Sequence, residues 1–283
     1  MEEKNQQKVG QVSKKITGTF EDYQDPYAHI VLSESEIEKA LRKARSEKAA
    51  EIHRQEYWKR INAPVEYPKM DYDQYKEFVT KRILARHPNF AVDEWNRDIF
   101  HSLLLYFMGD PAFEKIPKDK SNPSLGFYSL NKGIALLGGV GCGKTSLMMG
   151  FALNPNNPFL AVTCRKVAAE YADQKNGGHQ IIDFYSDVIS VNPRDHWGHK
   201  NVGRFFDDLG TEDKTKHFGN ELNVMANIFL DRYEIVDLKA KTHFTSNLSA
   251  DEIEEVYGQR VRSRVREMFN WIKFDPEAPD RRV

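Results

Sequence analysis

The chain has 283 residues, of which 40% are hydrophobic and 29% are charged, a composition typical of a globular protein with room for a full core. Its 41 lysines and arginines nearly balance 42 aspartates and glutamates, so the overall field does not favour polyanions, and contact with nucleic acid requires a local basic patch. The two cysteines, Cys142 and Cys164, are too few for a disulfide framework or a four-cysteine zinc site.

The start of the chain and its apolar runs carry no targeting or membrane signal. Residues 1–8 lack the apolar core of a signal peptide, and the longest apolar run, residues 103–108, is too short to cross a bilayer. We therefore expect a cytoplasmic protein with no membrane partner.

Residues 1–88 are predicted to form a helical N-terminal region that binds a partner, with a partly disordered start over residues 1–30. Ser33-Glu-Ser-Glu36 is a capping box, so a helix should begin there and run to about Ile61. Its apolar stripe is thin, which fits either a solvated helix or an arm that packs on another protein. A second helix is expected over residues 71–86, after Pro64 and Pro68.

The third predicted helix, residues 93–107, has a much richer apolar stripe, made of Trp95, Ile99, Phe100, Leu103, Leu104 and Phe107. Such a stripe belongs in a core, so we expect this helix to pack on a central sheet. The domain boundary then falls within residues 87–91, and the second domain spans residues 89–283.

A glycine-rich loop follows the short apolar strand predicted at residues 134–137 and opens a helix. Glycines let backbone amides wrap a polyphosphate, Lys144 can place its charge at the β and γ phosphates, and Thr145 can offer a hydroxyl to Mg²⁺. The alternative is a glycine turn with a solvated lysine. The loop predicts a binding site for ATP and Mg²⁺ formed by Gly138, Gly139, Val140, Gly141, Cys142, Gly143, Lys144, Thr145 and Ser146.

A second strand is expected at residues 159–163, followed by helices over about residues 165–173 and 181–190, and a third strand that ends in paired carboxylates. Ligands lie at the carboxyl ends of strands in doubly wound sheets, so Asp207 could reach the Mg²⁺ held by Thr145. Asp208 could then orient or deprotonate a water molecule, with Glu212 as a rival for that role. The alternative is a pair of aspartates in a surface turn.

Another strand is predicted at residues 242–247, after a helix over about residues 220–233, and it ends at Asn247. If this strand lies between the other two, Asn247 falls beside the γ phosphate and can hold the attacking water. The alternative is local, because Ser249-Ala-Asp-Glu252 is a capping box and Asn247 could belong to its turn.

Four motifs in order, GGVGCGKTS, FFDDLGTE, THFTSN and YGQRVRSR, resemble those of the AAA+ ATPases of the DnaC-type helicase loaders and IstB-like transposition ATPases. The resemblance covers about residue 93 to the carboxyl terminus. It implies a three-layer α/β P-loop fold whose parallel sheet has the order 5-1-4-3-2, with no C-terminal helical lid. The roles it implies are Walker B acid for Asp207, sensor for Asn247, and arginine finger for Arg264, with Arg260 second.

Three departures from the family pattern stand out. Asp208 replaces the glutamate that many AAA+ proteins use, which lengthens the distance to water. The expected absence of a lid leaves no clear second sensor, although Arg281 and Arg282 could serve. No cysteine precedes Cys142, so the zinc-binding N-terminal domain of some loaders is excluded.

The sequence thus predicts a Mg²⁺-dependent ATPase that delivers a replicative helicase to DNA. The N-terminal helices would grip the helicase, ATP would drive assembly of a homo-oligomer, and Arg165, Lys166 and Lys175 would contact single-stranded DNA. One alternative is an IstB-like helper that binds duplex DNA and a transposase. Another is a small-molecule kinase, which fits less well because paired carboxylates followed by Asn247 suit water activation.

Overall fold

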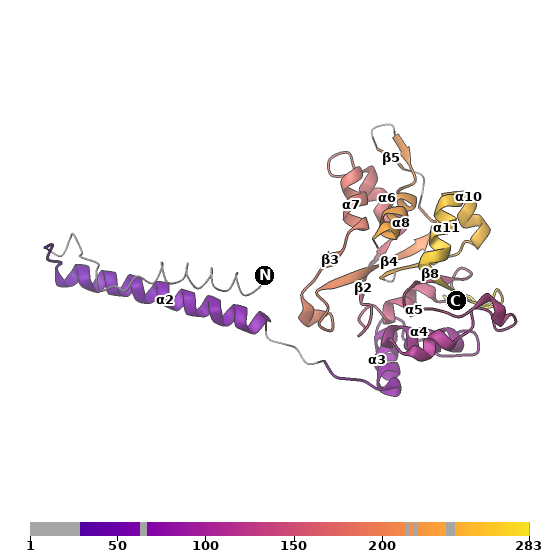
Figure 1. Cartoon of the computed structure of the whole chain (residues 1–283), viewed down its shortest axis with the longest axis horizontal. Coiled ribbons are helices and arrows are strands. Elements are labelled where there is room, and N and C mark those ends of the chain that lie inside the picture. The colour runs from indigo at the N-terminus through magenta and orange to yellow at the C-terminus, as the bar shows by residue number, and fades with distance from the viewer. Residues whose placement is uncertain (1–28, 63–66, 213–214, 218–219, 236–240, 283) are drawn as a thin grey trace, which may run out of the picture. The chain divides into compact units, whose positions relative to one another are not determined.

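A computed structural model describes residues 29–62, 67–212, 215–217, 220–235 and 241–282. By its internal contacts the chain divides into two compact units, residues 1–64 and residues 65–283. Figure 1 shows the elements of each unit. The predicted disordered start of the chain lies outside the described residues, apart from residues 29 and 30.

The described part of the first unit is dominated by α2 (Glu34–Asn62). The predicted capping box is present, because Ser33 N–H donates to Glu36 Oε2 at 2.9 Å and Glu36 N–H donates to Ser33 Oγ at 3.4 Å. Residues 34–60 of α2 are exposed, and five of their large apolar or aromatic side chains are 45–54% exposed: Ile37, Leu41, Ile52, Tyr57 and Trp58. No helix in the described ranges is both long and apolar enough to span a bilayer.

The second unit is built on a parallel sheet of five main strands. These are β1 (Gly133–Leu137), β2 (Phe159–Thr163), β4 (Asn201–Leu209), β7 (Thr242–Ser246) and β8 (Phe269–Lys273). Their spatial order is β2-β4-β7-β1-β8, which confirms the predicted order 5-1-4-3-2. A two-residue strand, β3 (Ile189–Ser190), pairs antiparallel with β4.

Helices cover both faces of the sheet, which makes the unit a three-layer α/β fold with a parallel sheet. One face packs against α3 (Tyr72–Leu84), α4 (Arg97–Met108) and α5 (Lys144–Gly150). The other packs against α6 (Cys164–Ala172), α7 (His179–Ser186), α8 (Val224–Glu234), α10 (Ala250–Tyr257) and α11 (Gln259–Met268).

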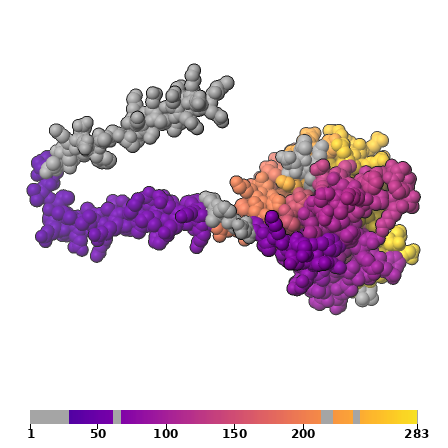
Figure 2. All heavy atoms as spheres, turned by 60° about the horizontal axis from the view of Figure 1, so that its bottom comes forward, coloured from indigo at the N-terminus to yellow at the C-terminus, as the bar shows by residue number. Residues whose placement is uncertain are grey.

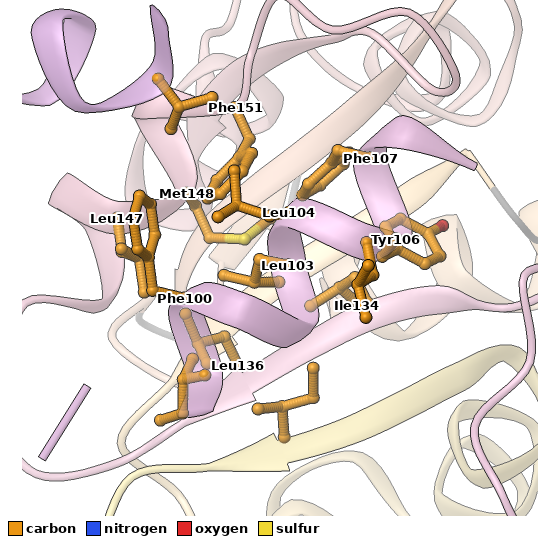
Figure 3. Packing of buried hydrophobic residues seen from close by; sticks show 14 of the residues in the cluster. Phe100, Leu103, Leu104, Tyr106, Phe107, Ile134, Leu136, Leu147, Met148 and Phe151 are labelled. Carbon is orange, nitrogen blue, oxygen red and sulfur yellow. The ribbon is translucent and has the colours of Figure 1, made fainter. Parts of the chain in front are cut away.

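Alternation along β1 explains why both layers are needed. All five residues of β1 are buried, with Ile134 and Leu136 in one core and Ala135 and Leu137 in the other, as expected when successive side chains point to opposite faces. Figure 3 shows Ile134 and Leu136 packed with side chains of α4 and α5.

The packing of α3 bears on where the second unit begins. Tyr75, Val79 and Ile83 are buried in the same core as α4 and α5, and a Cβ placed on Gly150 would lie 2.4 Å from Ile83 Cγ1. In Figure 2, α3 lies flush on the surface of this unit. Contacts therefore divide the chain after residue 64, whereas the functional boundary within residues 87–91 stays a prediction.

Three helix boundaries differ by four residues from those expected. The helix predicted from residue 93 begins at Arg97. The helix predicted from Asn220 begins at Val224, because the side chain of Asn223 caps it by accepting Ala226 N–H at 3.0 Å. Residues 220–222 instead form β6 (Asn220–Leu222), which pairs with β5 (Thr215–His217). The helix predicted over residues 181–190 ends at Ser186, and β3 takes the residues that follow.

Short 3₁₀ turns complete the unit: η2 (Pro111–Lys115), η3 (Pro123–Leu125) and η4 (Pro193–Asp195). Residues 274–282, the described residues after β8, contain no helix.

Candidate functional site

The glycine-rich loop lies between the end of β1 and the start of α5. Gly141 and Gly143 have φ angles of 79° and 101°, a left-handed region that residues with a Cβ rarely adopt. Because Gly143 immediately precedes α5, the loop brings its backbone to the positive end of a helix. Such a loop can cradle a phosphate group.

Lys144 is the most constrained side chain of the loop. It is 5% exposed, and its Nζ donates to Gly138 O at 2.9 Å, to Gly139 O at 2.8 Å and to Asn247 Oδ1 at 2.6 Å. These bonds use all three ammonium hydrogens. Burial lowers the pKa of Lys144. A phosphate reaching this ammonium group would have to replace at least one of these acceptors.

Thr145 and Asp207 lie in direct contact at the carboxyl edge of the sheet. Thr145 Oγ1 donates to Asp207 Oδ1 at 2.8 Å, and Thr245 Oγ1 donates to the same oxygen at 2.6 Å. Asp207 is 7% exposed, and burial raises the pKa of its carboxyl although the two hydroxyl groups oppose the shift. A hydroxyl beside a carboxylate is a donor set that suits Mg²⁺.

The backbone is irregular at Asp208. Its φ angle is 58°, and the register of β4 against β7 shifts between Phe206 and Leu209. Asp208 N–H donates to Thr245 Oγ1 at 2.9 Å. The Thr245 hydroxyl therefore holds both aspartates, because it accepts a hydrogen bond from the backbone of Asp208 and donates one to the carboxylate of Asp207. A bulge of this kind re-aims a side chain at the end of a strand.

Glu212, the rival of Asp208, has a different environment. Its carboxylate accepts Gly210 N–H at 2.9 Å and the hydroxyl of Tyr257. Burial raises the pKa of Glu212. Among the described residues, Asp208 lines the cavity at the phosphate loop and Glu212 does not.

That cavity measures about 900 Å³. It brings together the glycine-rich loop, Lys144, Thr145, both aspartates and Asn247, all of them predicted site residues. Of the glycine-rich loop, residues 140–146 line the cavity, whereas Gly138 and Gly139 do not. The remaining lining residues come from the segment before α4, from α5, from the turn after β4 and from the chain after β8: Arg86, His87, Pro88, Asn89, Phe90, Asn96, Leu147, Thr211, Phe274, Arg281 and Arg282. A nucleoside triphosphate fits this combination of a glycine cradle, cations and acidic groups.

Arg281 ties the end of the chain to the phosphate loop. Its backbone N–H donates to Gly141 O at 3.1 Å and its Nε donates to Cys142 O at 3.3 Å, while Nη2 lies 2.7 Å from Asp93 Oδ2. Arg281 is therefore engaged in holding the loop. Arg282 is exposed at the rim of the same cavity.

The two arginines predicted to act on a neighbouring subunit lie on α11, and neither is among the described residues that line the cavity. Arg264 Nη1 donates to Tyr233 Oη at 2.9 Å, and the guanidinium carbon lies 4.2 Å from the centre of the Tyr233 ring. Arg260 is exposed. Their roles stay predictions.

Sequence reasoning missed one residue that shapes the site. Thr245 lies two positions before Asn247, and the alternation of a buried strand could have placed it beside the aspartates. Arg204, a charged residue within β4, does not line the cavity; it is buried between Phe184 and Tyr185, with its guanidinium carbon 4.7 Å and 4.6 Å from their ring centres.

No protein-family model and no curated protein sequence matches this chain. Among solved structures it is similar to AMPPCP-bound DnaA from Aquifex aeolicus, with 17% identity, coverage of 66% of this chain and 49% of that chain, and a TM-score of 0.41. It is also similar to the DnaC helicase loader, with 14% identity, coverage of 66% and 94%, and a TM-score of 0.42.

A third similar structure is domain III of the Thermotoga maritima replication initiation protein DnaA, with 18% identity, 67% of each chain covered and a TM-score of 0.39. The chain spans about half the length of the Aquifex structure. At these identities the likeness concerns the fold alone.

Proposed function

We propose that this chain is a Mg²⁺-dependent ATPase that acts in DNA replication by delivering a replicative helicase to DNA. The observation that carries the ATPase proposal is the 2.8 Å contact between Thr145 and Asp207, made in the cavity that also holds Lys144, Asp208 and Asn247. A buried, charged cluster at the end of parallel strands is costly to maintain without a ligand.

Each of these residues of the cavity has a separate role in hydrolysis. Lys144 binds the β and γ phosphates, and Thr145 and Asp207 hold Mg²⁺, which when bound offsets phosphate charge. Asp208 accepts a proton from the attacking water as the water oxygen bonds to the γ phosphorus and the bond to the β–γ bridging oxygen breaks. Asn247 holds that water once its amide oxygen is released from Lys144.

The helicase proposal draws support from α2. Half-exposed apolar and aromatic side chains such as Leu41 and Trp58 recur along an otherwise charged helix, which is the pattern of a helix that binds a partner groove. ATP-dependent assembly of several copies and contact with single-stranded DNA belong to the same proposal.

Substitution of Lys144 tests nucleotide binding. We expect Lys144→Ala to weaken ATP binding by roughly 100-fold or more, because it removes a charge-assisted contact to the β and γ phosphates. Titration calorimetry with ATP and Mg²⁺ measures the affinity, and Lys166→Ala, an exposed lysine of α6, is the matched control. Equal affinity in Lys144→Ala and the parent would refute the proposal.

Co-purification tests the partner. The full chain should retain a replicative helicase, and the chain without residues 1–64 should lose it while still binding ATP. Transfer of the γ phosphate to a small molecule, or promotion of DNA strand transfer with a transposase on duplex DNA, would favour the kinase or the IstB-like alternative.

A further inference from the structure

A second cavity, of about 1110 Å³, lies along the edge strand β8. Its walls are α4, the segment 116–132 that precedes β1, and α11. In Figure 2 the surface of residues 110–130 adjoins the C-terminal residues on this face of the unit. Among the described residues, the two cavities share only Phe274, so this cleft is separate from the phosphate loop.

Six cations and four acids line the cleft: Lys118, Lys120, Lys132, Arg262, Arg266 and Lys273, with Glu94, Asp98, Asp119 and Asp275. Lys120 is paired with Asp98. Asp119 is engaged by its own turn, where it accepts the backbone N–H groups of Ser121 and Asn122 at 2.8 Å and 3.3 Å. The other five cations have no ion pair with any described residue, which leaves an excess of positive charge.

Two buried hydrogen-bond donors also lack acceptors. Arg262 Nε and Trp271 Nε1 are inaccessible to solvent and bond to no described residue, and both can only donate. The guanidinium of Arg262 lies 5.2 Å from the centre of the Trp271 ring, so the two groups form one feature of the cleft wall. Leaving a buried donor unpaired is destabilising, and an acceptor-rich ligand would remove that cost.

Lys118 and Lys132 both line the cleft. The pKa of Lys132 is lowered mainly by burial and further by the charge of Lys118. An anion placed between these lysines would relieve the repulsion.

We propose that this cleft binds a single-stranded nucleic acid, with phosphates at the unpaired cations and bases against the partly exposed rings of Trp95 and Tyr128. Cations spread over three elements together with aromatic rings are the combination that binds single strands without sequence preference. An acidic peptide would pair with the cations, but it has no bases that would stack on the aromatic rings. Binding in the cleft also assigns a function to Arg262 and Arg266, which have none at the phosphate-loop site.

This inference rests on the proposed action on DNA but not on ATP hydrolysis. It places the bound nucleic acid on a different surface from the one that the sequence predicts. Arg165, Lys166 and Lys175 are exposed on and after α6, and Lys166 is already paired with Glu170 at 3.6 Å.

Two triple variants with equal loss of charge test the proposal. The cleft variant is Lys118→Gln, Arg266→Gln, Lys273→Gln, and the α6 variant is Arg165→Gln, Lys166→Gln, Lys175→Gln; all six side chains are exposed, so both should fold. Binding of a fluorescent 20-nucleotide oligo(dT) to the full chain is followed by anisotropy at several salt concentrations, with and without ATP. Calorimetry with ATP checks separately that the phosphate-loop site is intact.

The cleft variant should bind oligo(dT) at least about tenfold more weakly at low salt, and its slope of log affinity against log salt should fall by about 2. The α6 variant should resemble the parent. Parent-like binding by the cleft variant would overturn the proposal, as would a parent that does not bind oligo(dT). Displacement of oligo(dT) by polyglutamate at equal charge concentration would also overturn it and assign the cleft to an acidic peptide. None of these measurements requires ATP hydrolysis. They therefore test the cleft independently of whether Lys144→Ala weakens ATP binding.

Discussion

Asp208 occupies a backbone conformation in which an ordinary side chain is strained. Its φ of 58° lies in the left-handed region, which aspartate and asparagine tolerate better than most residues. Because the residue also lines the cavity and its N–H is held by Thr245, the strain serves to aim a carboxylate. The short side chain of this aspartate is thus combined with a backbone bulge.

Asp208→Asn separates binding from hydrolysis. Asparagine accepts the same backbone conformation but cannot take a proton from water, so we expect ATP affinity to change less than about threefold and the hydrolysis rate to fall by roughly 10²–10⁴. Phosphate release at saturating ATP measures the rate. Glu212→Gln is the matched control, because Glu212 is held by Tyr257 and Gly210 away from the cavity. Normal turnover by Asp208→Asn together with a slow Glu212→Gln would reverse the assignment.

His243 makes the fold sensitive to acid. Its ring is fully buried, its Nδ1 accepts Ile134 N–H at 3.1 Å, and burial, together with the charge of Arg232, lowers its pKa to about 3. The unfolded chain, with an ordinary histidine pKa near 6.5, therefore binds a proton that the folded chain excludes. Stability should fall as the pH drops from about 6.5 toward 3.

We expect this one group to remove roughly 2 kcal/mol of unfolding free energy between pH 6.5 and pH 5. Urea unfolding at each pH measures it. His243→Asn should flatten the dependence, because asparagine keeps an acceptor for Ile134 N–H and does not titrate, whereas His179→Asn, at an exposed position, should not. Equal slopes in both variants and the parent would show that another group controls the acid response.

At the scale of elements, α3 belongs physically to the second unit. Its buried face, formed by Tyr75, Val79 and Ile83, completes the core over α4 and α5, and the close approach at Gly150 leaves no room for a larger residue there. Removing α3 would expose the apolar surface of α4 and α5 that the buried face of α3 covers. Burial of each such side chain is worth about 1.5–3 kcal/mol.

Truncation tests this arrangement directly. A chain that starts at residue 65 should unfold cooperatively with the stability of the parent, while a chain that starts at residue 89 should lose several kcal/mol or fail to fold. Urea unfolding measures both. In the full chain, Ile83→Ala should cost about 2–4 kcal/mol and Ile37→Ala, exposed on α2, less than about 0.5. Equal stability of the two truncated chains would place α3 outside the folding unit.

The sequence predicted most strands and helices because their apolar periods and caps are local. Helix α10 begins where the capping box Ser249–Glu252 indicates, and β1 and β7 keep their predicted residues within one position. The start of α8 was harder, because asparagines at positions 220 and 223 are both good caps and only the pairing of β6 with β5 decides between them.

Non-local geometry explains what the sequence could not supply at the site. The apolar periodicity of α3 predicts that one face of the helix is buried. It does not predict which surface covers that face. Likewise, the role of Thr245 depends on the register of β7 against a bulged β4, and that of Arg281 on the path of the chain after β8. Such facts arise from tertiary pairing, which no short motif encodes.

At the scale of the whole molecule, α11 divides its arginines between different surroundings. Arg262 is held over Trp271, Arg264 is held against Tyr233, and Arg260 is exposed. Tyr233 Oη also donates to Glu267 Oε2 at 2.7 Å, so Arg264 belongs to a small network rather than lying free in solvent. If Arg264 acts on a neighbouring subunit, assembly must replace its contact with Tyr233 by a contact with the γ phosphate.

Mixing two inactive proteins tests that exchange. A fixed guanidinium at the transferring phosphate can raise the rate by roughly 10³–10⁵, so Arg264→Ala should be nearly inactive alone. Lys144→Ala should also be inactive, because it cannot bind ATP tightly. Together they should recover part of the ATPase activity, since a Lys144→Ala subunit can lend its arginine to the intact phosphate loop of an Arg264→Ala subunit.

Arg260→Ala in place of Arg264→Ala is the matched control, and a deeper loss in that variant would transfer the role to Arg260. Light scattering establishes that the mixed proteins co-assemble, because recovery requires contact between unlike subunits. Co-assembly without recovered activity would mean that Arg264 does not act between subunits. The network with Tyr233 and Glu267 would then be structural, and Arg264→Ala would lower stability rather than turnover.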